Sequence, residues 1–349
     1  MEIMNSDYRL EYYSTEAETS LRKFWQRVWT PPPVQKSSTW FRWIVCENPG
    51  IPKGYTPLLL AKQGEKVVGQ LVLMPTQLFH QGKAYRVCWG RDLYVEKEHR
   101  RNKIALRLYD MWVNDFEGAL ASGQSEEARK LQNKYGWIVI SPIHQYEKLF
   151  FRPRYLAGSL KNGALIAGKR FLAMMVSEVY RLRPLAIPGI EVKVGRTFDR
   201  RVDQLWVACR EQYSNICMRD HAWLRWRFEN HPYADYLLFE AFDRHGAYGG
   251  YCVGRIEDGT AFIVDLLTEK DETGRRMRRA LIQAAESCFK DRGVVRVVCR
   301  CLSSELEVSL CEAGYLQTQY TSALAIKSRL DDFPRDQWYV TAADSDLDR

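Results

Sequence analysis

A cluster of basic residues follows a short apolar strand pattern and precedes a predicted helix, a placement that could hold a phosphorylated ligand. The helix is predicted over residues 105–116, with its first turn beginning at about Asn102 to Ile104. The first backbone N–H groups of a helix have no intrahelical partner and lie at the positive end of the helix dipole. A diphosphate placed there would accept hydrogen bonds from them. Arg100 and Arg101 would add positive charge and forked donors.

The elements around this segment occur twice in the chain. The pattern W-Φ-R-W, followed by a proline, begins at Trp40 and again at Trp223, displaced by 183 residues. The pattern D-L-Φ-x-E-K-acid begins at Asp92 and again at Asp265, displaced by 173 residues. Correspondences that recur in the same order indicate a repeated structural unit. The alternative is two unrelated α/β domains that share common local patterns.

Each copy predicts the same order of elements: two helices, three strands, a helix, a strand, a helix and a last strand. In both copies a serine caps the last helix and a glycine ends it, at Ser125 and Gly136 and at Ser303 and Gly314. The two tryptophans of each W-Φ-R-W pattern share one helix face, which favours core packing over a pocket lining. The predicted fold class is α/β (α+β mixed), with two tandem domains, each a twisted mixed sheet flanked by helices.

The boundary between the two domains is predicted near the middle of the chain. Residues 1–185 form the predicted N-terminal domain, which includes a connecting helix at 164–183, and residues 186–349 form the C-terminal domain. Pro184 and Pro188 mark the boundary, because proline ends a helix and favours a turn.

Composition narrows the class of protein. The net charge of +8 suits a phosphorylated ligand, an acidic substrate or an anionic surface, but the basic residues are too dispersed for a dedicated DNA-binding protein. The nine cysteines include no C-x-x-C pair and favour a reducing compartment. The N-terminus lacks an apolar signal region, and the longest apolar stretch, residues 171–176, is too short to cross a bilayer. A cytoplasmic protein is expected. The six histidines show no metal-ligand spacing, so no metal site is predicted.

The order of elements, the D-L-Φ-V strand, the basic loop and the helix ending in Gly-aromatic together resemble the GNAT superfamily of acyl-CoA N-acyltransferases. The resemblance covers most of both halves. The segment from Val95 to Ala105 is similar to the family pattern V-x-P-E-x-R-x-x-G-x-G/A. Arg100 and Ala105 fit that pattern, whereas Lys97 replaces its proline and Lys103 its first loop glycine.

The resemblance implies acetyl-CoA or another acyl-CoA as co-substrate, with its pyrophosphate on this loop. The residues implied for the CoA site are Tyr94, Val95, Arg100, Arg101, Asn102, Lys103, Ile104 and Ala105. Backbone N–H groups near Tyr94 and Val95 are the implied contacts of the oxyanion and the pantetheine. Asp92 is the candidate general base, and a purely structural role at a strand end is the alternative. The tyrosine that many members use as general acid is replaced by Gln132 in the first half and Leu310 in the second.

The corresponding loop of the second half carries acidic residues. Asp271 stands where the family has Arg or Gln, and it would repel a diphosphate. Four arginines follow it, at Arg275, Arg276, Arg278 and Arg279, and a basic exposed helix face explains them. The first half is therefore the expected CoA site.

Three functions are compatible with these features. The favoured one is transfer of an acyl group from acyl-CoA to the amine of a small molecule, amino sugar or polysaccharide precursor, without a nucleic acid partner. A Fem-like transferase that uses aminoacyl-tRNA is the second, because the doubled fold and positive charge permit it. A non-catalytic binding module is the third, because the loop glycine and the tyrosine are replaced.

Overall fold

The computed structural model describes residues 7–29, 37–150, 168, 171–172, 175, 187–345 and 347–348. Most of the predicted connecting helix at 164–183 lies outside these residues. The four residues described within that range, at positions 168, 171, 172 and 175, are helical.

The described part of the chain is a mixed α/β structure, as predicted. The strands are β1 (Tyr8–Tyr12), β2 (Leu58–Gln63), β3 (Lys66–His80), β4 (Lys83–Val95), β5 (Gly118–Ala121), β6 (Ile138–Leu149), β7 (Ile190–Gly195), β8 (Asn215–Cys217), β9 (Tyr236–Asp243), β10 (Tyr248–Glu257), β11 (Thr260–Thr268), β12 (Arg296–Leu302), β13 (Leu316–Lys327) and β14 (Trp338–Thr341). The helices are α1 (Glu18–Val28), α2 (Ser38–Cys46), α3 (Ile104–Asp115), α4 (Glu126–Lys134), α7 (Val202–Gln212), α8 (His221–Leu224), α9 (Glu272–Asp291) and α10 (Ser304–Glu312).

The predicted order of elements is present in the first half, from α1 to β6, and in the second half, from α7 to β13, with the unpredicted β8 between α7 and α8. The serine caps are also confirmed, because Ser125 accepts the N–H of Ala128 and Ser303 accepts that of Leu306. The prediction missed a leading strand in each half, β1 and β7, which pair antiparallel with β2 and β9. Both are short edge strands with few buried side chains, so their sequences carry little apolar signal.

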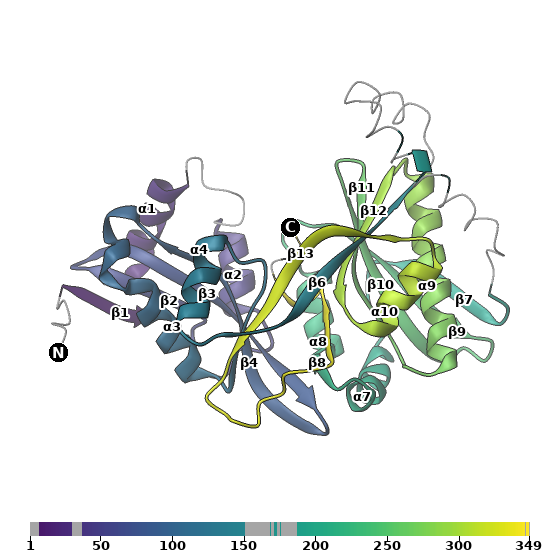
Figure 1. Ribbon diagram of the computed structural model, residues 1–349, viewed down its shortest axis with the longest axis horizontal. Coiled ribbons are helices and arrows are strands. Elements are labelled where there is room, and N and C mark those ends of the chain that lie inside the picture. Colours follow the sequence, from purple (N-terminus) through teal and green to yellow (C-terminus); the bar gives the residue numbers. More distant parts are fainter. Residues whose placement is uncertain are drawn as a thin grey trace.

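Fourteen strands of the described chain form one sheet, and its middle is made by an exchange of strands between the halves. β6 of the first half pairs with β12 of the second, and β13 of the second half pairs with β5 of the first. β6 and β13 also pair with each other, and Figure 1 shows them running side by side between the two lobes. Each half therefore completes the sheet of the other.

The two W-Φ-R-W patterns meet at the centre of the molecule. Trp43 Nε1 donates to the Trp226 carbonyl and Trp226 Nε1 donates to the Trp43 carbonyl, both at 2.9 Å. The two rings stack with centroids 4.8 Å apart. All four tryptophans of the patterns are buried, which confirms core packing. Because equivalent residues make equivalent contacts, the two halves are related here by an approximate twofold axis.

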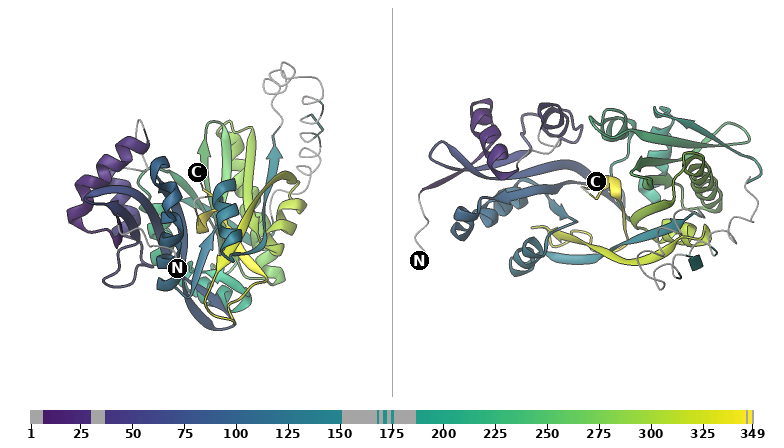
Figure 2. Two further views of the ribbon diagram at one scale, coloured as in Figure 1. Left: turned by 60° about the vertical axis from the view of Figure 1, so that its left-hand side comes forward. Right: turned by 90° about the horizontal axis from the view of Figure 1, so that it is seen from above.

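Helices cover both faces of the sheet (Figure 2). On one face, α1 and α2 share a single apolar core with α7 and α8. On the other face, α3 packs on the first half and α9 and α10 pack on the second, in separate cores. The shared core and the exchanged strands thus hold the halves together.

Replacing Trp226 by Phe should lower the free energy of unfolding by about 1–3 kcal/mol, because the buried Trp43 carbonyl loses its donor. Trp43→Phe should have a similar effect, since the two contacts are reciprocal. Urea unfolding measures both. Trp338→Phe is the control, because Trp338 is also buried but its Nε1 has no hydrogen-bond partner in the described chain. An equal loss in all three variants would contradict a role for the paired hydrogen bonds.

Candidate functional site

The candidate site begins where β4 parts from β5. These parallel strands pair only from Val87 with Gly118 to Trp89 with Leu120. β4 continues to Val95, paired with β3 on its other side. The last six residues of β4 therefore lie beyond its pairing with β5, and residues 90–94 are partly exposed there.

A bulge interrupts β4 at this position. Arg91 pairs with Val72 and Tyr94 with Gln70, so that Asp92 and Leu93 face a single residue of β3. Asp92 adopts a left-handed conformation, with φ of 51°, which is uncommon for a residue other than glycine. Bulges and left-handed residues often lie at functional sites, where they re-aim backbone groups and side chains.

The Asp92 carboxylate lies in a partly buried, basic environment. Its side chain is 14% exposed, and Oδ2 is 3.6 Å from Arg91 Nε. The Asp92 carbonyl accepts a hydrogen bond of 3.3 Å from Gln70 Nε2, which helps to fix the bulge. The sequence identified Asp92 as a candidate but carried no sign of the bulge.

The basic loop leads from β4 into α3. A short 3₁₀ helix spans Lys97–Asn102, Lys103 follows with φ of 56°, and α3 begins at Ile104. The helix start matches the predicted position. Lys103 thus adopts the left-handed conformation that glycine adopts most easily. In the described chain no side chain caps α3, and the N–H groups of Leu106 and Arg107 bond to the Lys103 carbonyl.

The predicted loop residues fall into three groups. Arg100 Nε donates to the Val95 carbonyl at 3.0 Å, and its guanidinium lies 5.5 Å from the centre of the Tyr94 ring. Asn102 Nδ2 donates to the Tyr8 hydroxyl at 3.0 Å. These two side chains therefore brace the loop. Arg101 and Lys103 are exposed instead. Ile104 is fully buried and Ala105 is half-buried, so of these two only Ala105 can offer a backbone group to a diphosphate.

The equivalent helix start in the second half is already occupied. Asp271 caps α9 by accepting the N–H of Gly274 at 2.7 Å, so a carboxylate stands where a diphosphate would bind. Arg278 is buried, and its guanidinium donates to the Thr268 hydroxyl at 2.6 Å. The sequence had grouped this arginine with an exposed basic face, and the structure corrects that assignment.

The parting of strands in the second half is filled by the C-terminal segment. β11 pairs with β12 only as far as Ile263 with Cys299, and β14 then takes the place of β11 beside β12. Behind β14, Arg219 is fully buried between two carboxylates, with Nε 3.3 Å from Asp265 Oδ2 and Nη2 2.5 Å from Asp344 Oδ2. Asp265, the repeat partner of Asp92, therefore serves as scaffold.

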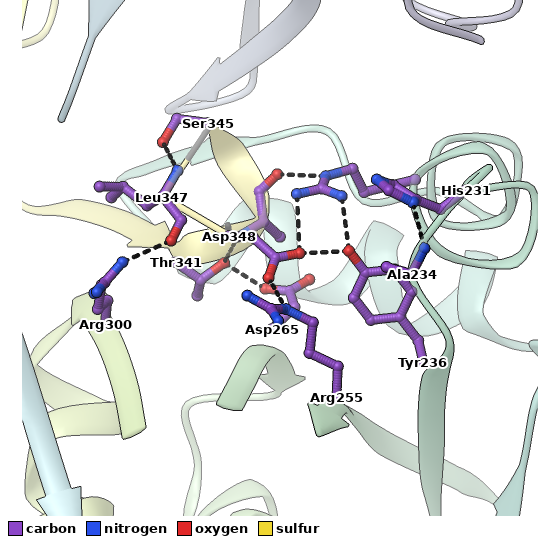
Figure 3. Close-up of polar contacts among 12 residues, drawn as sticks. His231, Ala234, Tyr236, Arg255, Asp265, Arg300, Thr341, Ser345, Leu347 and Asp348 are labelled. Atoms are coloured by element: carbon purple, nitrogen blue, oxygen red, sulfur yellow. Dashed lines mark hydrogen bonds and ion pairs between the residues drawn. The ribbon is translucent and has the colours of Figure 1, made fainter. Parts of the chain in front are cut away.

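The segment after β14 forms hydrogen bonds with both halves, and Figure 3 shows its contacts with the second half. Asp348 accepts from Arg255 Nε at 2.6 Å and from the Tyr236 hydroxyl at 2.5 Å. Burial opposes ionisation, but Arg227 and Arg255 outweigh it and lower the pKa of Asp348. Toward the first half, Ser122 at the end of β5 donates to the Ser345 hydroxyl at 2.7 Å. The segment after β14 thus lies between the halves.

Neither residue that replaces the family tyrosine is placed to act as an acid. Gln132 is buried and donates to the Tyr109 hydroxyl at 3.3 Å, and Leu310 is buried in the core of the second half. Burial raises the pKa of Tyr109 to about 12. Within the described ranges, no group of three His, Cys, Asp or Glu residues could hold a metal ion, and no helix is both long and apolar enough to span a membrane.

Comparison with known proteins supports the fold. No family model and no curated protein matches the sequence. A probable N-acyltransferase from Enterococcus faecalis is 12% identical, with a TM-score of 0.62 over 92% of this chain and 72% of that one. A GCN5-related N-acetyltransferase from Anabaena variabilis has the same identity and coverage, with a TM-score of 0.64. N-myristoyltransferase from Saccharomyces cerevisiae, with bound myristoyl-CoA, is 11% identical, with a TM-score of 0.59 over 99% of this chain and 85% of that one.

The chain has the GNAT fold. The resemblance inferred from the sequence is confirmed at this level. At 11–12% identity the comparison establishes the arrangement of the elements, and the chemistry has to be argued from the site.

Replacing Lys103 by Gly should raise the free energy of unfolding by up to about 1 kcal/mol. The left-handed conformation costs an ordinary residue about 1–2 kcal/mol and costs glycine nothing, while glycine's greater freedom in the unfolded chain offsets part of the gain. Chemical denaturation measures this change. Lys97→Gly is the matched control, because Lys97 is exposed in the same loop with an ordinary negative φ, and it should lose about 0.5–1 kcal/mol. A comparable loss in both variants would contradict strain at Lys103.

Proposed function

We propose that this protein is an acyltransferase that moves an acyl group from acetyl-CoA or another acyl-CoA to an amine acceptor, with the donor bound by the first half. One observation carries the proposal: the parting of β4 and β5 lies next to an uncapped helix start in the first half. In the second half the same two features are filled, by β14 and by the Asp271 cap.

The donor is proposed to lie along the parting of the strands. Its pyrophosphate accepts a hydrogen bond from the N–H of Ala105 in the first turn of α3, while Arg101 and Lys103 supply exposed positive charge. Arg100 and Asn102 hold the loop in shape. The pantetheine runs beside β4 and meets backbone groups of Tyr94 and Val95, as the fold implies.

The proposed reaction is a direct transfer. The amine loses a proton to Asp92, its nitrogen forms a bond to the thioester carbonyl carbon, and the carbon–sulfur bond then breaks. Backbone N–H groups at the bulge stabilise the oxyanion of the tetrahedral intermediate. Water protonates the departing thiolate, because Gln132 stands where many relatives carry a tyrosine. An amide and free CoA are the products.

The comparisons agree with a CoA donor. Two of the similar structures are described as an N-acetyltransferase and a probable N-acyltransferase, and the yeast structure holds myristoyl-CoA. A small molecule, an amino sugar or a polysaccharide precursor is the proposed acceptor class. We also propose that residues 1–185 and 186–349 are two GNAT-like domains that exchange their last strands, a division supported by the pairing of β6 with β12 and of β13 with β5.

CoA at a hundredfold excess over its Kd should raise the free energy of unfolding by about 2.7 kcal/mol, seen as a higher Tm. Arg101→Glu should remove most of this stabilisation, because it places a negative charge beside the diphosphate. Arg101 is preferred to Arg100 for this test, since Arg100 also braces the loop. Arg276→Glu is the control, because Arg276 is an exposed arginine on α9, the equivalent helix of the second half. Loss of the CoA effect in the control alone would move the donor site to the second half.

Asp92→Asn should lower kcat by about 10²–10⁴-fold, the usual contribution of a positioned general base, while the CoA-induced rise in Tm persists. Release of free CoA thiol over a panel of primary amines measures turnover. Asp110→Asn serves as the control, because Asp110 is an exposed carboxylate of α3 outside the site. Wild-type turnover retained by Asp92→Asn would exclude Asp92 as the base. CoA binding without release for any amine would favour a binding module instead of an enzyme.

A further inference from the structure

The side chain of Arg91 is buried next to the candidate base without a full set of partners. Its side chain is 10% exposed, and within the described chain its Nε has no hydrogen-bond partner and only a long ion pair, 3.6 Å from Asp92 Oδ2. Nη1 donates only to the sulfur of Met74, at 3.7 Å, which is a weak acceptor. A buried guanidinium ordinarily forms strong hydrogen bonds with carboxylates or phosphates, so these unmet donors call for an explanation.

Arg91 belongs to the face of the sheet on which the two halves meet. Its guanidinium lies 5.4 Å from the centre of the Trp40 ring, on α2 in the shared core. This face is opposite to α3, whose start is the proposed diphosphate site. A residue here can reach an acceptor that approaches Asp92 from the side opposite to the donor.

The positive charge around this face comes from both halves. Burial lowers the pKa of His231 to about 3, with further lowering by Arg227, Arg91 and Arg255 and partial compensation by Asp348. The His231 ring packs 4.6 Å from that of Trp43, so the region adjoins the central tryptophan pair. Arg255 is buried as well and pairs with Asp348, and its Nη2 has no hydrogen-bond partner among the described residues.

We propose that Arg91 binds an anionic group of the acceptor, a carboxylate or a phosphate, and so positions the acceptor amine at Asp92. The inference rests on the proposed acyl transfer and deepens it, because it assigns the acceptor to the class of amines that carry a negative group. Arg91 Nε and Asp92 Oδ2 are 3.6 Å apart, so one small molecule spans both through its anion and its amine. Among the described residues the polar partners of Arg91 are the Met74 sulfur and the 3.6 Å ion pair with Asp92, and the anion supplies a closer oxygen acceptor.

Matched pairs of amines test this class. The panel compares each amino acid with its amide, phosphoethanolamine with ethanolamine, and glucosamine 6-phosphate with glucosamine. Each amine is tested with acetyl-CoA and with long-chain acyl-CoA as the donor. The anionic member of at least one pair should have a kcat/KM about 10-fold or more above that of its neutral partner. The carboxylate and phosphate pairs identify which anion is used. A neutral member preferred in every active pair overturns the proposal.

Variants of Arg91 separate binding from stability. Arg91→Met should raise KM for the anionic amine about 10-fold or more, leave kcat within about 3-fold and abolish the preference within the pair. Arg91→Lys should restore part of it, because the charge remains while the forked geometry is lost. Arg86→Met is the control, since Arg86 is exposed on the same strand, and it should change none of these values. Preference retained in Arg91→Met overturns the proposal.

Crystals soaked in selenate give a readout that needs no turnover. Anomalous scattering should place a selenate within hydrogen-bond distance of Arg91 Nε in the wild type, and Arg91→Met crystals should lack it. Selenate absent from Arg91 in the wild type overturns the anion site, even if neutral amines are acylated. Selenate present at Arg91 without turnover of any amine supports the anion site and counts against the acyltransferase reaction alone.

Discussion

The exchange of β6 and β13 is the interaction on which the rest of the structure depends. Each long strand leaves its own half and pairs with a strand of the other. The sheet of either half is therefore incomplete without a strand from its partner. The reciprocal Trp43–Trp226 contact lies at the centre of this arrangement. Two units joined in this way share a core on one face, and Arg91, the proposed anion-binding residue, lies against Trp40 of that core.

Both halves contain a parting of two parallel strands beside a helix start, but this position is filled differently in each half. In both, a parallel pair of strands parts after a few residues and a helix begins beside the parting. In the second half, β14 fills the space and Asp271 caps the helix. In the first half, the helix start has no side-chain cap among the described residues, and exposed basic residues precede it. A structural part occupied by protein in one copy can thus remain available to a ligand in the other.

Two of the five described non-glycine residues with positive φ lie at the candidate site. Asp92 and Lys103 both adopt left-handed conformations, at the bulge and directly before α3. Such residues persist where surrounding contacts fix them, and here Gln70 holds the Asp92 carbonyl while Arg100 and Asn102 brace the loop. Asp92 and Lys103 thus mark the two ends of the segment that leads from the end of β4 to the start of α3, from the proposed chemistry to the proposed diphosphate site.

The amino-acid sequence alone determined the repeated order of elements, the serine caps at Ser125 and Ser303, the burial of the tryptophan patterns and the position at which α3 begins. These features follow from side-chain periodicity and from capping chemistry within a few residues, which are local. Only the tertiary structure decided the exchange of β6 and β13, the insertion of β14, the burial of Arg219 and Arg278, and the unmet donors of Arg91. Each of these depends on which distant strands pair and in which register, and short-range patterns do not encode that choice because many pairings satisfy the same apolar alternation.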